Sequence, residues 1–537
     1  MQLDLDSIRP VSSPRVIGGG LEGAERTSRE TLKWDSPIIS PDRQINPVKE
    51  DADARGRDMV QNNGYVMGAV QTHKDGIVGA QYRLNCQPDY ELLGATEDWA
   101  EQFQLFVESY FNLFAEDPEC WFDAARNKTF TDIIRLVVGG FCFTGEALST
   151  AEWMDREPER PFKTAIQLVS PSRLCNPDMQ PDSKTLRRGI ERNVYGRAIK
   201  YWFKKTHPGD LFMDPSANLG WVPVDARKPW GRRQVIHIIE PLQADQTRGI
   251  ADMVSVLKQM RMTKKFSEIT LQNAVVNATY AAAVESELPK DLVFGSMGMG
   301  QTGFEEMLGG YLSSLQEYIG AAGNIAIDGV KMPHLFPGTK LSLKPMGTPG
   351  GVGTDFEASL LRHIAAPLGM SYEEFSRDFT KTNYSSARAS MGQTWKFLQA
   401  RKKSVADKYA TMVYHLWFEE QMNLGRVPLP PGFTPETYYS DPGKRAALLA
   451  CDWIGASRGQ IDELKETEAA VLRIERGLST LELENGRLGQ DWRKTMRQRA
   501  RETKLSKKLG LDFSAQAGKP AADGAKVKKE ETADAED

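Results

Sequence analysis

The residue pattern most suggestive of chemistry is a glycine-rich motif, GMGQTG, at residues 298–303. It matches G-x-G-x-x-G, in which a tight turn between a strand and a helix binds the phosphates of a dinucleotide. Here a long helical pattern and Pro289 precede the motif, and the nearest candidate acid, Asp328, lies in another glycine-rich turn. We therefore expect an ordinary loop. A nucleotide-dependent enzyme using 298–303 is kept as the alternative function.

Other catalytic patterns are missing from the sequence. It contains neither the G-x-x-x-x-G-K-[ST] phosphate-binding loop nor the G-x-S-x-G nucleophile motif. None of the six histidines lies three or four residues from another, so none pairs with a second to bind a metal from one helix face. We interpret His237 and His363 as structural histidines. The sequence therefore predicts no enzyme, no cofactor and no metal site.

Adjacent carboxylates are also interpreted as structural. Glu419 and Glu420 follow each other directly in a helical pattern. Neighbouring side chains on a helix point in different directions, so the two carboxylates do not form a general acid and base pair. We expect them to lie on solvated faces.

A polar stretch, DFTKTNYSS at 378–386, stands before a long helical pattern and contains a single lysine. Ser385 is a candidate N-cap, because its hydroxyl could accept a hydrogen bond from a free backbone N–H of that helix. From the residues alone we expect an exposed turn in which the lysine is incidental. The polar side chains of interest are those of Thr380, Lys381, Thr382 and Asn383.

The elements that would position these residues are mostly helices. Apolar residues recur every three or four positions in several long stretches, which predicts amphipathic or buried helices. Short alternating runs between Gly and Pro predict strands within 163–240. The fold class is therefore α+β, mainly helical. Helices are expected at 98–117, 129–148, 248–288, 355–369, 386–422 and within 458–510, and strands at 165–171, 197–205 and 234–241.

Composition excludes several function classes. The chain has 537 residues, a formal net charge of −4 and 40% hydrophobic residues, which fits a globular protein with a real core. Tight nucleic-acid binding usually needs a basic excess, which the whole chain does not have. Five scattered cysteines without a CxxC pair predict reduced thiols. The sequence has no secretory signal and no apolar run of about 18 residues, so we expect no membrane association.

Six segments together resemble the portal proteins of lambda-like tailed phages. They occur in family order across nearly the whole chain, which makes the resemblance specific. The segments are NNGYVMGAVQTHKDGIVGAQYRL (62–84), EPLQADQTRG (240–249), YAAAVESEL (280–288), VKMPHLFPGTKLSL (330–343), SLLRHIAAPLGMSYEEFSRDFTKTNYSSARAS (359–390) and CDWIGASRGQIDELKE (451–466).

The resemblance implies a homo-oligomeric ring, of twelve subunits in the family, at one vertex of the capsid. Double-stranded DNA would enter and leave through its central channel. The implied partners are the terminase large subunit, which supplies the energy for packaging, head–tail adaptor and completion proteins, and the major capsid and scaffold proteins. The implied location is the virion, after assembly in the host cytoplasm.

The resemblance also implies a division of the chain, and it alone gives the named parts. These are an extended N-terminal arm (1–50), a wing (51–247), a first stem helix (248–276), a clip (277–352), a second stem helix (353–371), a tunnel loop (372–385), a long wing helix and linker (386–450), a crown (451–510) and a disordered tail (511–537).

In this division, the side chains at 380–383 would meet DNA at the narrowest point of the channel. Lys381, repeated around the ring, would contact phosphates weakly. A second basic group lies at helical spacing on the first stem helix and would face either the channel or a neighbouring subunit, although a solvated or intersubunit face is the plainer interpretation. It consists of Lys258, Arg261, Lys264 and Lys265.

Overall fold

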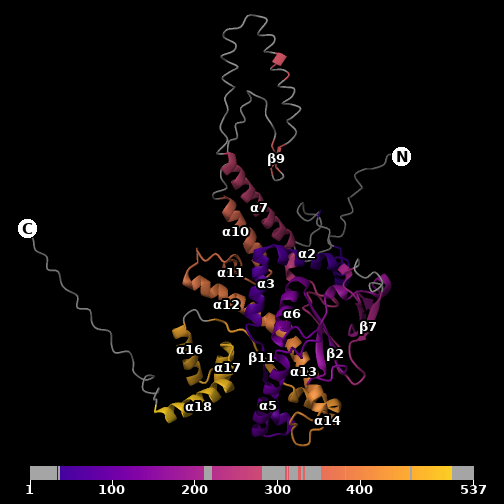
Figure 1. Ribbon diagram of the computed structural model, residues 1–537, viewed down its shortest axis with the longest axis vertical. Helices are drawn as coiled ribbons and strands as arrows, with labels where there is room; N and C mark the ends of the chain where they lie inside the picture. Colours follow the sequence, from indigo (N-terminus) through magenta and orange to yellow (C-terminus); the bar gives the residue numbers. More distant parts are fainter. Residues whose placement is uncertain are drawn as a thin grey trace, which may run out of the picture. The chain divides into compact units, whose positions relative to one another are not determined.

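The computed structural model describes residues 33, 37–210, 220–280, 309–310, 313, 325–327, 330–332, 352–380, 382–459 and 463–510 (Figure 1). Contacts between its residues divide the chain into two compact units, and each unit is assembled from three separate stretches. Unit 1 comprises 1–54, 80–251 and 403–455, and unit 2 comprises 55–79, 252–402 and 456–537.

Unit 1 contains most of the strands. Its helices are α1 (Pro41–Ile45), the start of α2 (Lys49–Asn62), α4 (Tyr90–Leu93), α5 (Glu97–Ala115), α6 (Phe130–Thr144), α13 (Lys408–Asn423), α14 (Pro435–Ser440) and α15 (Pro442–Leu448). Its strands are β1 (Arg83–Cys86), β2 (Glu146–Trp153), β3 (Thr164–Leu168), β4 (Leu186–Arg187), β5 (Ile190–Arg192), β6 (Ala198–Lys204), β7 (Trp221–Asp225), β8 (Val235–Ile239) and β11 (Cys451–Ile454). Short 3₁₀ turns lie at Pro171–Arg173, Pro177–Met179 and Pro208–Asp210.

An aromatic core joins α5, α6 and α13. Thr96 caps α5 by accepting a hydrogen bond from the backbone N–H of Trp99 at 3.3 Å. The helix buries residues three or four positions apart, as predicted, and the ring of its Phe111 lies edge-on to Trp417 of α13 at 5.2 Å. Phe130 of α6 contacts Phe111 in the same way at 5.4 Å. Each ring removed from water in this core stabilises the fold by about 1.5–3 kcal/mol.

The helix predicted at 129–148 is too long. Helix α6 ends at Thr144, and β2 begins at Glu146. Gly145 between them has φ +69°, and a Cβ there would lie 2.3 Å from the carbonyl carbon of Ile250. Only glycine fits this close approach of two backbones in a left-handed conformation. The chain therefore turns at Gly145 and enters the sheet.

Two antiparallel sheets surround a second, smaller core in unit 1. One has the strand order β3–β2–β8 and the other β4–β5–β6–β7. The predicted strands at 165–171, 197–205 and 234–241 are confirmed as β3, β6 and β8. The buried cluster shared by these sheets consists of Leu148, Val169, Leu174, Ile190, Tyr201, Phe203 and Val235.

The two ends of unit 1 differ from the expectation. Within the predicted extended arm, residues 41–45 and 49–50 are helical, and buried Asp42 accepts hydrogen bonds from the backbone N–H and hydroxyl of Thr247. At the other end, β11 pairs antiparallel with β1. The first residues of the predicted crown, at 451–454, therefore belong to a sheet of unit 1.

Unit 2 is helical in its larger elements. These are the end of α2, α3 (Gly64–Ile77), α7 (Leu257–Tyr280), α10 (Val352–Ala365), α11 (Tyr372–Ser376), α12 (Tyr384–Arg401), α16 (Glu463–Glu475), α17 (Leu481–Arg487) and α18 (Trp492–Leu509). A 3₁₀ turn at Asp252–Val256 leads into α7, and a short hairpin is formed by β9 (Ile325–Ile327) and β10 (Val330–Met332). Helices α7 and α10 lie side by side (Figure 1), with the rings of Phe266 and Phe356 6.0 Å apart.

Both predicted stem helices are shorter than expected. Helix α7 begins at Leu257 rather than 248, because Arg248 and Gly249 are held in the core of unit 1 by Glu146. Helix α10 ends at Ala365 rather than 371, and Gly369, at φ +67°, turns the chain towards α11. The predicted helix at 386–422 is confirmed as α12 and α13, joined by a π-helical turn at Lys402–Asp407.

Three further predictions from the sequence concern membrane association, the state of the cysteines and the fold class. Within the described residues no helix is both long and apolar enough to cross a membrane. All five cysteines are free thiols, as predicted. The fold class, α+β and mainly helical, is confirmed.

Candidate functional site

The predicted tunnel loop at 372–385 is partly helical. Its first five residues form α11, which Ser371 caps by accepting a hydrogen bond from the backbone N–H of Glu374 at 3.3 Å. The ring of Phe375 is buried and stacks on Tyr65 of α3 at 5.8 Å. The guanidinium of Arg362 lies over the Tyr372 ring at 4.9 Å. These contacts fix the base of the loop, so its non-helical part is limited to 377–383.

The turn that follows exposes small polar groups. Arg377 has φ +59°, ends α11 and donates a hydrogen bond to the Thr72 hydroxyl at 3.0 Å. Asp378 accepts hydrogen bonds from the backbone N–H of Thr380 at 3.1 Å and from its hydroxyl at 2.6 Å. The backbone N–H of Thr382 donates to the carbonyl of Phe379 at 3.2 Å. Lys381, between them, lies outside the described residues.

The N-cap of α12 is Asn383, and the prediction of Ser385 is wrong. The Asn383 side chain accepts a hydrogen bond from the backbone N–H of Ser386 at 2.9 Å, and the Ser386 hydroxyl reaches back to the backbone of Asn383. Asparagine caps a helix as well as serine does, since either side chain satisfies a backbone donor of the first turn. Asn383, which is exposed and is one of the residues predicted to contact DNA, thus also caps the helix.

Helices α3 and α12 pack against the turn that precedes the loop. The His73 ring of α3 is buried, and its Nε2–H donates to the carbonyl of Leu368 at 3.0 Å. Phe397 of α12 meets the edge of that ring at 5.9 Å, and a Cβ at Gly369 would lie only 2.3 Å from Phe397. Burial lowers the pKa of His73 to about 4, so the ring is neutral near pH 7.

The basic group on α7 forms a continuous stripe of three cations. At 100° per residue, Lys258, Arg261 and Lys265 fall within about 60° of one another on the helix, and all three are exposed. Lys264 lies further round and is half-buried. Among the described residues no carboxylate forms an ion pair with any of the four. The stripe is free to interact with an anion or an acidic surface.

Helix α18 is strongly basic, although the net charge of the whole chain is slightly negative. It carries eight arginine and lysine residues and one acid, Glu502, and every residue in it is at least partly exposed. The formal net charge of −4 for the chain was the reason to exclude tight nucleic-acid binding. A count over each predicted element, rather than over the chain, would have found this helix.

The sequence reasoning was wrong about Glu419 and Glu420, which are buried. Glu420 accepts hydrogen bonds from the backbone N–H groups of Lys163 and Thr164 at 2.7 and 2.8 Å, and Glu419 forms an ion pair with Arg232 at 3.1 Å. The Glu420 carboxylate thus serves as the hydrogen-bond acceptor for two backbone N–H groups at the start of β3.

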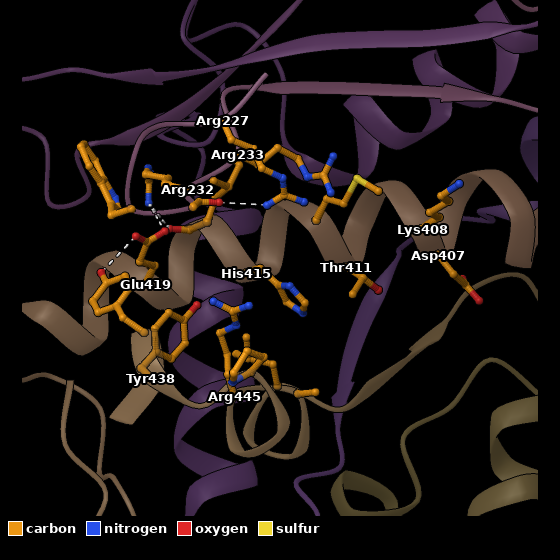
Figure 2. Close-up of a pocket in the computed structure, with 18 of the residues that line it drawn as sticks. Arg227, Arg232, Arg233, Asp407, Lys408, Thr411, His415, Glu419, Tyr438 and Arg445 are labelled. Carbon is orange, nitrogen blue, oxygen red and sulfur yellow. Dashed lines mark hydrogen bonds and ion pairs between the residues drawn. The ribbon is translucent and has the colours of Figure 1, made fainter. Parts of the chain in front are cut away.

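A cavity of about 550 Å³ in unit 1 lies beside the Arg232–Glu419 pair (Figure 2). The hairpin after β7 forms one side of this cavity, helix α13 the floor, and helices α14 and α15 the other side. This cavity could not be predicted from the sequence, because its basic residues come from three distant stretches. Its residues include Arg227, Trp230, Arg233, His415, Tyr438 and Arg445.

The predictions for the two structural histidines and for the glycine motif compare differently with the structure. His237 is half-buried, with its Nε2 3.8 Å from Glu146, which agrees with a structural role. His363 is exposed on α10, so that interpretation is wrong. The motif at 298–303 and nearly all of the predicted clip lie outside the described residues. Within the described part of the chain, no group of three or more metal-binding side chains gathers.

Comparison with known proteins gives the class. The family model described as "Phage portal protein, lambda family" matches residues 27–402. The portal protein B of Escherichia phage lambda is 37% identical over 506 residues, covering 93% of this chain and 92% of that protein. The portal protein of Escherichia phage N15 is 37% identical over 534 residues, covering 98% and 97%. The chain belongs to the lambda family of phage portal proteins.

A solved structure is similar at lower identity. The neck of an empty gene transfer agent particle has a chain that matches with a TM-score of 0.42 and 12% identity, covering 87% of this chain and 99% of that one. Family membership points to a structural, non-enzymatic role as a component of the phage particle, and gives no support to a nucleotide-dependent enzyme.

Proposed function

We propose that this chain assembles into a ring of about twelve subunits at one capsid vertex and that double-stranded DNA passes through the central channel during packaging and ejection. The observation that carries the proposal is the match to the portal family over residues 27–402, together with relatives named portal proteins that align over nearly the whole chain. The named partners of the proposal are terminase, head–tail adaptor proteins, and the capsid and scaffold proteins, in a particle assembled in the host cytoplasm.

The tunnel loop is proposed as the part of each subunit nearest to DNA. Its described tip offers the hydroxyl of the half-buried Thr382 and the amide of Asn383, beside a Thr380 hydroxyl that donates to Asp378, on a base fixed by α11 and α3. Hydroxyls and amides bind phosphate oxygens weakly, and each added cation would raise affinity through release of counterions. One lysine per subunit, Lys381, therefore suits the narrowest part of a conduit through which DNA must slide.

Two basic surfaces extend the proposed DNA contacts. The stripe on α7 lies on the proposed first stem helix, where a lumen-facing or intersubunit position would use its unpaired cations. Helix α18 lies in the proposed crown, where its eight cations would meet DNA inside the particle. Both surfaces would contact the phosphates of DNA through charge. The affinity of these contacts would therefore fall as salt concentration rises and would not depend on DNA sequence.

The experiment is the substitution Lys381→Ala. We expect light scattering and negative-stain images to show the same ring for the variant and the parent, and we expect DNA packaging or retention in particles to change. Lys396→Ala, which removes an exposed lysine from α12, is the control and should leave both unchanged. Loss of assembly in Lys381→Ala would contradict the tunnel-loop position. A parent protein that forms no ring, even with scaffold protein, would contradict the proposed function itself.

A further inference from the structure

The cavity in unit 1 contains an excess of positive charge that the fold does not neutralise. Three arginines on two sides of it, Arg227, Arg233 and Arg445, approach a single histidine, His415, on the floor. Figure 2 shows His415 between the hairpin arginines and Arg445. We call these four residues, with Trp230 and Tyr438, the arginine pocket.

The carboxylates of the cavity are already engaged. Glu419 accepts hydrogen bonds from Arg232 at 3.1 Å and from the Tyr439 hydroxyl at 3.0 Å. Arg232 also donates to the carbonyl of Leu416 at 3.1 Å. Asp407 is buried, accepts a hydrogen bond from Tyr82 and lies 3.9 Å from the ammonium of Lys403. Neither acid is available to the three arginines.

The arginines of the pocket have few partners of their own. Arg227 donates one hydrogen bond, to the carbonyl of Gly231 at 2.9 Å, and the Arg445 guanidinium lies 5.5 Å from the centre of the Tyr438 ring. Among the described residues no carboxylate pairs with Arg227, Arg233 or Arg445. Arg233 and Arg445 are half-buried, and Arg227 is exposed. Guanidiniums in this position repel one another, and an anion would relieve the repulsion.

The electrostatics of the pocket agree with this geometry. Burial and the nearby Arg227 lower the pKa of Arg233, and burial with Arg197 and Arg445 lowers the pKa of Arg227. Burial, followed by Arg233 and Arg445, lowers the pKa of His415 to about 4. The imidazole is therefore neutral near pH 7. It leaves the arginines as the charged donors and can itself exchange a hydrogen bond with a ligand.

The shape and lining indicate which anion fits. The guanidiniums converge in a hollow, whereas the phosphates of duplex DNA lie on a convex surface and would not enter it. Guanidinium groups bind both carboxylate and phosphate in a two-pronged arrangement, so the choice between these anions rests on the shape of the site. A second cavity of about 630 Å³ adjoins the first and shares Trp230, Arg232, Glu419 and Tyr439 with it. Its other residues include Trp153 and Leu424 and the charged Glu152, Lys228 and Glu420. Two adjoining cavities of charged and aromatic side chains fit a peptide better than a free ion.

We propose that the arginine pocket binds the aspartate or glutamate side chains of an acidic protein segment supplied by another molecule. The carboxylate would lie between Arg233 and Arg445 above His415, with Arg227 at the rim. The flanking residues of the segment would pack on Trp230 and Tyr438. This interaction goes beyond the conduit function, and it does not depend on which residues face the DNA.

The test measures binding of a labelled peptide to the full-length protein by fluorescence anisotropy. The probe is a fluorescein-labelled octapeptide of alternating Asp and Glu, and its counterpart of alternating Asn and Gln has the same shape without charge. We expect the double variant Arg233→Gln/Arg445→Gln to bind the acidic probe at least about tenfold more weakly, because two charged hydrogen-bond donors are lost. The uncharged counterpart should not bind to the parent.

The matched control removes two exposed lysines from unit 1. The variant Lys444→Gln/Lys184→Gln changes net charge by the same amount and should bind within about twofold of the parent. Thermal unfolding of the arginine variant should occur at the same temperature as the parent or higher, since repulsion is relieved. A lower unfolding temperature would show that the arginines hold the fold together, and would overturn the proposal.

Three binding results would also overturn it. These are equal weakening in the lysine control, equal binding of the uncharged octapeptide, and unchanged binding of the acidic probe by the arginine variant. A duplex DNA oligonucleotide and inorganic phosphate complete the series. If the arginine variant lost affinity for either of these and not for the acidic peptide, the pocket would be a phosphate site and the proposal would be wrong.

Discussion

At the scale of single residues, Arg248 shows how a buried charge can organise a large part of the chain. Its guanidinium is fully buried and forms a two-pronged ion pair with Glu146, at 2.7 and 2.8 Å. It also donates to the carbonyls of Leu174, Arg188 and Pro171. Burial alone would raise the pKa of Glu146, but Arg248 and Lys49 hold it well below its usual range. The pair connects β2, the second sheet and the segment leading to α7.

We predict that Arg248→Met lowers the free energy of unfolding of unit 1 by about 3–5 kcal/mol, because Glu146 is left as a buried charge without its partner. Denaturant unfolding of the full chain, followed by tryptophan fluorescence, measures the change. Arg188→Gln removes only the ion pair of the half-buried Arg188 with the exposed Glu50 and should cost less than about 1 kcal/mol. Equal effects of the two substitutions would contradict the central position of Arg248.

Residue-level prediction from sequence succeeded where a property is local and failed where it depends on distant partners. The polar character of 380–383 could be read directly, and so could a capping residue before the long helix, although Asn383 rather than Ser385 occupies that position. The burial of Glu419 and Glu420 could not be predicted, because it depends on Arg232 and on the start of β3, which lie more than 180 residues away.

At the scale of elements, α3 and the turn after α10 are joined through a neutral histidine. His73 donates to the Leu368 carbonyl, and its Nδ1 has no hydrogen-bond partner among the described residues. Its folded-state pKa of about 4 lies below the ordinary value of 6.5. The unfolded chain therefore binds a proton between these values while the folded chain does not, so this contribution to stability is present above pH 6.5 and is lost as the pH falls towards 4.

We predict that unit 2 loses up to about 3 kcal/mol of stability from this single group as the pH is lowered through that range. His73→Gln keeps a donor for Leu368 without a titrating ring, so its unfolding temperature should depend less on pH. His363→Gln, at an exposed site on α10, should retain the parent's pH dependence. An unchanged slope in His73→Gln would show that His73 is not the group that titrates.

Element prediction was most accurate where a periodic pattern was long. Helices α5, α12 and α13 and strands β3, β6 and β8 lie where the sequence places them. Errors occurred at ends that tertiary contacts decide. The turn at Gly145 follows from the close approach of Ile250, and the late start of α7 follows from the capture of Arg248 by Glu146. Neither contact can be read from a local pattern, because its partners are about 100 residues apart in sequence.

At the scale of the whole molecule, charge is divided unevenly. The chain carries a net charge of −4, yet α18 alone carries eight cations and one acid, and α7 presents a stripe of three. Charges that cancel in the total act separately when they lie further apart than about 8–10 Å, the screening distance at physiological salt. The neutral balance of the chain therefore does not describe the surfaces that a partner would meet.

We predict that removal of residues 514–537 leaves both the fold and the oligomer unchanged. This stretch contains one valine and no other large apolar residue, so it has little to bury. The last described helix, α18, already ends before it at a glycine C-cap, Gly510 with φ +70°. Light scattering should give the parent mass, and stability should change by less than about 0.5 kcal/mol. A large drop in the unfolding temperature would show that the tail is docked.

The division of each unit into three stretches has a consequence for synthesis on the ribosome. In unit 1, β1 cannot pair until β11, which ends at Ile454, has been synthesised. By then β1 has already left the ribosome. At about 5–20 residues per second, roughly 25–90 s separate the first residue from position 455. During that interval neither unit can close. The sheets β3–β2–β8 and β4–β5–β6–β7 can form once β8 has been made, but β1 waits without its partner. The nascent chain therefore cannot complete one unit before it begins the other.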